Sequence, residues 1–370
     1  MGGGGGHAFR WASRKTPLGA AAALAALFSC IGPGAWAAGY HLVKVVPLPQ
    51  VTGWDYLKID PQKRELFISN NSGVIVLNID TFREVGTIPS TADWRGVGLV
   101  HGVAVSNRLG LGFISREIPA SVVTFRLSNL EILRSTPTDR GTDAVVYDPV
   151  TERVFTFNGK YPGVHDVTAI DAVTGRRLAD IALPGVPEFP VADRRGHLFD
   201  NVSSVSGLAR ISTRSLKVSA VWPMGPCVHP SALAIDRLHR RLFAACQNRI
   251  MVMISADSGR VIGSVPTGAG TDSARYDPGT RDVFAANGSG TLTVAREVTP
   301  DRMVLLQQVR TGPNGRSMAL DPNTHRVFVM SAKFGAFGHS FARYNPHDRL
   351  NPHGYPGVVR GTARLLIFGP

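Results

Sequence analysis

The chain has 370 residues, of which 44% are apolar and 18% charged, so it can bury a large core and is not intrinsically disordered. Its three cysteines exclude a disulfide-dense scaffold and a cysteine-rich zinc or iron–sulfur protein, and the lack of a Cys-x-x-Cys-His motif excludes covalent c-type haem. The formal net charge of +13 is compatible with an anionic partner but does not identify one.

The N-terminus has the pattern of an export signal. A basic segment is followed by an Ala/Leu-rich apolar run over residues 18–28, which is too short for a stable membrane anchor. Small residues then precede a cleavage site after Ala37 or Ala38, so we expect a periplasmic or secreted bacterial protein without a later membrane span. A lipoprotein is the alternative, because Cys30 ends a loose lipobox, although the bulky Phe28 argues against it. The basic residues are Arg10, Arg14 and Lys15.

After the signal peptide (1–37), residues 38–370 repeat one unit seven times. Each unit has a short apolar run, an Asp that is often followed by Pro, and a second run that contains a Phe. The Asp-Pro pair sets a turn, and two further apolar runs complete the unit. Four short strands per unit of about 43 residues, without helical periodicity, predict an all-β, seven-bladed β-propeller with four-stranded blades. The repeated phenylalanines are Phe67, Phe113, Phe155, Phe199, Phe243, Phe284 and Phe328.

The two ends of the repeat predict how the ring closes. Residues 40–47 form one strand too many at the start, and residues 364–368 form a third strand of a blade that lacks a fourth. We therefore expect the N-terminal strand to complete the seventh blade, which removes open sheet edges. Residues 333–361, rich in Pro, Gly, His and Arg, are predicted to be a loop insertion within that blade.

Five short motifs carry a resemblance to a known family: Gly53-Trp54-Asp55-Tyr56-Leu57, Pro187-Glu188-Phe189, residues 222–227, residues 290–294 and residues 318–322. They resemble motifs of the YVTN-repeat, or YncE-like, family of exported seven-bladed propellers. The chain departs from the repeat most in its second unit, where residues 109–112 replace the usual turn. The resemblance implies the fold and no single activity, because related propellers include lactonases and nucleic-acid-binding proteins.

One position per unit supplies the candidate site. Propellers usually bind ligands where their innermost strands begin, and counting five residues back from each turn residue aligns seven side chains there. The ring has four carboxylates, which require a cation, hydrogen-bond donors or a raised pKa, and Arg316 is expected to offset part of their charge. Alternatively, the carboxylates join one blade to the next by accepting backbone hydrogen bonds. The ring consists of Asp55, His101, Asp143, Glu188, Ser231, Asp272 and Arg316.

Three functions remain open at this stage. We favour a non-catalytic, monomeric protein that binds a small ligand or a partner protein at the channel mouth. The first alternative is a metal-dependent lactonase-like hydrolase that uses calcium or zinc, with His101 or a carboxylate activating water. The second is a single-stranded nucleic-acid binder using basic and aromatic residues of the 333–361 insertion, including His339, His347 and His353. The expected metal ligands are Asp55, Asp143, Glu188 and Asp272.

Cys227 and Cys246 flank one predicted hairpin whose turn lies near Leu238. The chain doubles back between them and can bring the two thiols together. In an oxidising compartment this arrangement predicts a disulfide bond, and two buried free thiols are the alternative.

Overall fold

The structure is a computed structural model that describes residues 1–2, 39–71, 73–90, 99–159, 163–335 and 357–370. The predicted signal peptide, with Cys30, and most of the predicted 333–361 insertion, with its three histidines, lie outside these residues. Ala38–Pro370 forms one compact unit. The described part of the chain contains no apolar helix of membrane-spanning length.

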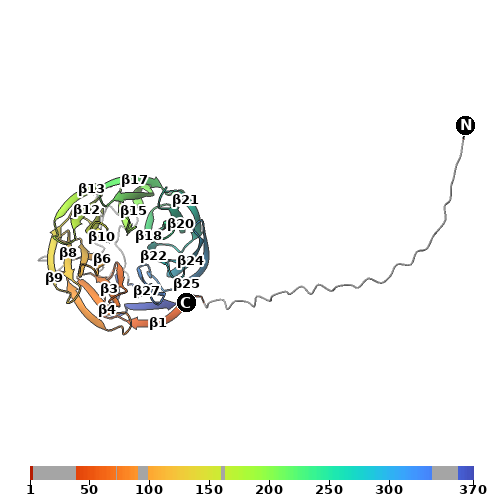
Figure 1. Cartoon of the computed structure of the whole chain (residues 1–370). Coiled ribbons are helices and arrows are strands. Elements are labelled where there is room, and N and C mark those ends of the chain that lie inside the picture. Colours follow the sequence, from red (N-terminus) through yellow and green to blue (C-terminus); the bar gives the residue numbers. More distant parts are fainter. Residues whose placement is uncertain (3–38, 72, 91–98, 160–162, 336–356) are drawn as a thin grey trace, which may run out of the picture. The chain divides into compact units, whose positions relative to one another are not determined.

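The compact unit is a ring of seven four-stranded antiparallel sheets, as predicted (Figure 1). The described residues contain a single short 3₁₀ helix, Ser203–Val205. Blades 1 to 3 consist of β2 (Leu57–Asp60), β3 (Glu65–Asn70), β4 (Gly73–Asn78) and β5 (Glu84–Pro89); β6 (Val100–Ser106), β7 (Leu111–Arg116), β8 (Ser121–Arg126) and β9 (Ile132–Pro137); and β10 (Thr142–Asp148), β11 (Arg153–Asn158), β12 (Asp166–Asp171) and β13 (Arg177–Ala182).

In each blade the first-named strand is innermost in the ring. Blades 4 to 6 consist of β14 (Pro187–Ala192), β15 (His197–Val202), β16 (Gly207–Ser212) and β17 (Lys217–Pro223); β18 (Pro230–Asp236), β19 (Arg241–Cys246), β20 (Ile250–Ser255) and β21 (Val261–Pro266); and β22 (Thr271–Asp277), β23 (Asp282–Asn287), β24 (Thr291–Thr299) and β25 (Arg302–Arg310). Blade 7 consists of β26 (Met318–Asp321), β27 (Arg326–Ser331), β28 (Arg364–Gly369) and β1 (His41–Pro47).

The repeated Asp forms the turn between the two inner strands. Asp60 Oδ1 accepts a hydrogen bond from the backbone N–H two residues later, and the same contact recurs at Asp148, Asp193, Asp236, Asp277 and Asp321. The residue that ends this turn has a positive φ, as at Arg64 (59°). Blade 2 has Gly110 in this conformation (φ 66°), and glycine adopts it without steric cost, so the turn forms there without the repeated Asp.

The seven repeated phenylalanines pack between blades. Each is at most 1% exposed, and each lies on the second strand of its blade. Both faces of these central strands are buried, because neighbouring blades stack against them, and this explains the continuous apolar runs seen in the sequence.

The N-terminal strand closes the ring as expected. β1 pairs antiparallel with β28 as the outermost strand of blade 7, from His41 opposite Gly369 to Pro47 opposite Arg364. Inside the ring, Arg64 of blade 1 forms an ion pair with the fully buried Asp321 of blade 7, with 2.8 Å between Nη1 and Oδ2. Blades 1 and 7 are therefore joined in two ways: by this ion pair, and by β1, which belongs to blade 7 and leads along the chain into blade 1.

Cys227 and Cys246 form the predicted disulfide bond, with their Cα atoms 5.5 Å apart. Cys246 ends β19, and Cys227 lies just before β18, so the bond fixes the loop that leads into the innermost strand of blade 5. Both residues are buried against the cluster that contains Phe199 and Leu233.

Candidate functional site

The seven predicted site residues lie where the innermost strands begin. Asp55 and Arg316 come two residues before β2 and β26. In the other five blades the ladder register is interrupted beside the site residue, and such β-bulges redirect a side chain out of the regular alternation. These interruptions fall between Val100 and Val103, Thr142 and Val145, Pro187 and Pro190, Pro230 and Ala232, and Thr271 and Ser273.

Serine side chains of neighbouring blades fix two of these strand starts. The Ser69 hydroxyl of blade 1 donates to the backbone carbonyl of His101 in blade 2. Likewise the Ser115 hydroxyl of blade 2 donates to the carbonyl of Asp143 in blade 3. Both serines are fully buried, so the backbone under His101 and Asp143 is held by the packed core.

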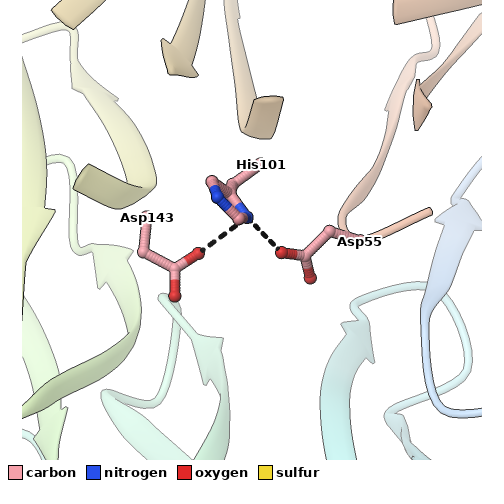
Figure 2. A group of neighbouring side chains, drawn as sticks. All are labelled: Asp55, His101 and Asp143. Carbon is pink, nitrogen blue, oxygen red and sulfur yellow. Dashed lines mark hydrogen bonds and ion pairs between the residues drawn. The ribbon is translucent and has the colours of Figure 1, made fainter. Parts of the chain in front are cut away.

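His101 lies between carboxylates on both sides of its ring. Its Nδ1 is 2.6 Å from Asp55 Oδ2 and 3.6 Å from Asp143 Oδ1, while its Nε2 is 2.9 Å from Glu117 Oε2. Figure 2 shows the two aspartates converging on the ring from blades 1 and 3. Ionised carboxylates only accept hydrogen bonds, so contacts with carboxylates at both ring nitrogens suit the doubly protonated imidazolium.

The four predicted carboxylates surround one tyrosine. The pKa of the Tyr56 hydroxyl is raised well above its usual value, first by burial and then by the negative charges of Asp143, Asp55, Glu188 and Asp272. Tyr56 therefore stays protonated. All four carboxylates act on this hydroxyl, and of the four, Asp55 and Asp143 are the ones grouped with His101 among the described residues.

Arg316 and Ser231 contribute in other ways. Arg316 Nε lies 3.3 Å from Asp272 Oδ2, so it offsets the charge of that carboxylate, as expected from their neighbouring blades. The Ser231 hydroxyl donates to the carbonyl of Thr271 at 2.6 Å and accepts from Gln247 Nε2 at 2.8 Å. Ser231 thus joins blades 5 and 6.

Glu117, which contacts His101, lies outside the seven aligned positions of the repeat and was not predicted as a site residue. This residue follows β7, and its backbone N–H donates to the carbonyl of Leu99 at 2.8 Å, which places it beside the start of β6. The predicted hairpin could have indicated it. In a hairpin, a residue just after the second strand (β7) lies opposite a residue just before the first strand (β6). Its side chain is 8% exposed.

The ligand-bearing atoms of Asp55, His101 and Asp143 lie within 4.8 Å of one another, close enough to share one metal ion. The Glu117 contact at Nε2 has the form of an outer carboxylate that orients a metal-bound histidine, which leaves Nδ1 as the ligand atom. Two oxygens and one imidazole nitrogen suit zinc and related ions better than calcium, which prefers oxygen ligands alone. The residues present therefore fit a transition-metal ion.

Comparisons with known proteins give the fold without a family. No protein-family model and no curated protein matches the sequence. Similar solved structures include the WD40 repeats of RRP9 (10% identity, TM-score 0.70, covering 88% of this chain and 97% of that one). A chain of the mitotic checkpoint complex (11%, 0.66, 78% and 88%) and hydrazine synthase of Kuenenia stuttgartiensis (13%, 0.61, 75% and 92%) are also similar. At these identities the likeness shows the seven-bladed β-propeller fold alone.

Proposed function

We propose that this protein is an exported, YVTN/YncE-like propeller that binds a divalent metal ion, zinc in the first place, at one mouth of its central channel. The observation that supports this most is the position of His101, whose Nε2 contacts Glu117 while its Nδ1 faces Asp55 and Asp143. Binding of the ion at Nδ1 displaces one proton from the ring, and the ion then offsets the negative charge that the imidazolium offsets without it.

The metal-binding proposal is tested by metal content and affinity. We expect about one zinc per chain by mass spectrometry after purification without chelator, and zinc binding by calorimetry. The double variant Asp55→Asn and Asp143→Asn should lose that ion. The control is Asp80→Asn, which removes one negative charge at a side chain that is 54% exposed. A protein without metal that also fails to bind added zinc would contradict the proposal.

The second candidate is the metal-dependent hydrolase. Asp55, His101 and Asp143 would offer three ligand atoms, which is the number that catalytic zinc sites commonly take from the protein. Asp55, His101 and Asp143 would hold the ion, which would supply Lewis-acid chemistry for a lactone carbonyl, and a ring carboxylate such as Glu188 would accept the proton from water. Lactone hydrolysis that requires zinc and disappears in the double aspartate variant would support this candidate over simple binding.

A scaffold that binds partner proteins remains compatible with the fold. One similar structure is a chain of the mitotic checkpoint complex, a multi-protein assembly by its name. Pull-down from a periplasmic extract, compared between the wild type and the metal-site variant, tests whether a partner recognises the same mouth.

A further inference from the structure

A second feature of the channel is a cavity of about 790 Å³ that is lined by the innermost strands of all seven blades. Its lining begins at the residues that follow the site positions, such as Tyr56 and Gly102, and extends to the Asp turns. Among the described residues, its charged lining has five basic side chains and a single carboxylate, Asp60. The basic residues are Lys58, Arg108, Arg194, Arg237 and Arg275.

Four of these basic groups act on one another. The pKa of Lys58 is lowered from 10.5 to about 8, first by burial and then by the positive charges of Arg275, Arg237 and Arg194. They come from blades 1, 6, 5 and 4, so they approach the cavity from several sides of the ring. Arg108 is different, because it forms an ion pair with Glu152.

Backbone carbonyls, and not carboxylates, hold two of these groups in place. Arg275 donates to the carbonyls of Ala274 at 2.7 Å and Leu57 at 3.1 Å. Arg237 Nε donates to the carbonyl of Ala192 at 2.9 Å. These bonds fix the guanidinium groups without neutralising their charge.

The other two basic groups, Lys58 and Arg194, form no side-chain hydrogen bond or ion pair with any residue that the structure describes. The single carboxylate of the lining, Asp60, has one oxygen in use, because its Oδ1 accepts hydrogen bonds from the backbone N–H of Gln62 and from Asn107, whereas its buried Oδ2 has no hydrogen-bond partner among the described residues. The lining therefore has an excess of cations over its single carboxylate, Asp60, whose negative charge acts on Lys58, and such an excess of positive charge suits an anion.

The part of the cavity that Lys58, Arg194, Arg237 and Arg275 line is called the chamber below. An aromatic pair separates it from the carboxylates of the mouth. The rings of Tyr56 and Phe189 are 5.5 Å apart. The charges of the four carboxylates raise the pKa of Tyr56 on one side of this pair. On the other side, the Arg275 guanidinium lies 5.1 Å from the centre of the Phe189 ring. The channel therefore has two regions of opposite charge, which suit different ligands.

We propose that the chamber bounded by Lys58, Arg194, Arg237 and Arg275 binds a compact small-molecule anion with three or more negative charges. Guanidinium groups pair with phosphate and with carboxylate oxygens alike, so polyphosphates and polycarboxylates share the required chemistry. The volume accommodates either of them. This site is separate from the metal site at the carboxylate mouth.

The test is calorimetry on the full chain with pyrophosphate and with citrate as probes, at low ionic strength. We expect one of the two to bind with one-to-one stoichiometry, to raise the melting temperature, and to bind more weakly as salt is added. The probe that binds more tightly identifies a phosphate or a carboxylate ligand. At pH 8 binding should also take up as much as about half a proton, because Lys58 is then about half protonated and the anion favours its charged form.

Lys58→Gln should weaken binding roughly tenfold or more by removing one charge-assisted contact. Lys217→Gln removes one positive charge from an exposed residue on β17 and should leave the affinity unchanged. Arg194→Gln, at an exposed turn position, serves as a second chamber variant if Lys58→Gln does not fold. The inference is overturned if neither anion binds, or if the Lys58 and Lys217 variants weaken binding equally, since the anion would then sense only the net charge.

Discussion

The Nε2 atom of His101 lies 2.9 Å from Oε2 of Glu117, and the two side chains are only 7% and 8% exposed. Both belong to the first hairpin of blade 2, since His101 is the second residue of β6 and Glu117 directly follows β7. The rigid hairpin therefore sets the orientation of the imidazole, and the aspartates from the neighbouring blades meet it at Nδ1.

Replacing Glu117 with Gln should weaken zinc binding about tenfold to a hundredfold, because the outer carboxylate orients the ring and raises the basicity of Nδ1. Calorimetric titration with zinc measures the change. Glu131→Gln, at a side chain 57% exposed, is the matched control and should bind zinc like the wild type. Unchanged zinc affinity in the Glu117 variant would assign this carboxylate a purely structural role.

Arg64→Gln should lower the free energy of unfolding by about 2–4 kcal/mol, because it leaves the buried carboxylate of Asp321 without its cation. Urea unfolding measures the loss, and Arg83→Gln at an exposed position is the control. The double variant with Asp321→Asn should recover part of the loss, since the unpaired charge is then removed. No recovery would mean that the contact acts through packing and not through charge.

The buried Glu297 of blade 6, which lies near Asp236 of blade 5, should make the free energy of unfolding depend on pH. The pKa of Glu297 is raised from 4.5 to about 7, chiefly by burial and further by the neighbouring Asp236 carboxylate, while Tyr276 acts in the opposite direction. Between pH 4.5 and 7 the folded chain keeps a proton that the unfolded chain has released, so this group's contribution to stability falls as the pH rises.

Glu297→Gln should therefore remove this pH dependence and raise the free energy of unfolding at pH 8 by about 2 kcal/mol. Urea unfolding at pH 5 and pH 8 gives the comparison. The exposed Glu84→Gln should change neither value. A variant less stable than the wild type at pH 8 would show that the ionised carboxylate is needed there.

Replacing Cys227 and Cys246 together with Ala should lower the free energy of unfolding by about 3 kcal/mol, as expected for a loop of this length. Thermal melting with and without reductant measures the same bond. The wild type should lose stability on reduction, whereas the double variant should not respond. Equal responses of the two proteins would show that the reductant acts elsewhere.

Much of the fold could be predicted from the sequence because its signals are local and repeated. Each Asp forms its turn within two residues, and each Phe marks the second strand of its blade. The extra strand at one end and the missing strand at the other indicated closure by residues 40–47. The disulfide also followed from a hairpin that brings Cys227 and Cys246 together.

The site could be predicted only as a set of aligned positions. The alignment identified four carboxylates that act on Tyr56, but it did not show that Asp55 and Asp143 meet at His101. Those contacts depend on bulges that redirect the side chains and on serines of the adjacent blades. Ser231 has the same position in the alignment and joins two blades instead.

The sequence by itself determined the number of blades, their turns and the closing strand, since these follow from contacts between residues close in the chain or from a regular period. Only the tertiary structure decided which charges meet. Lys58 and Arg275 follow the site position by three residues, and Arg194 and Arg237 follow it by six, yet they form one chamber. Ring closure brings these residues together across more than two hundred positions of sequence, and a pattern along the chain does not record distances across the channel.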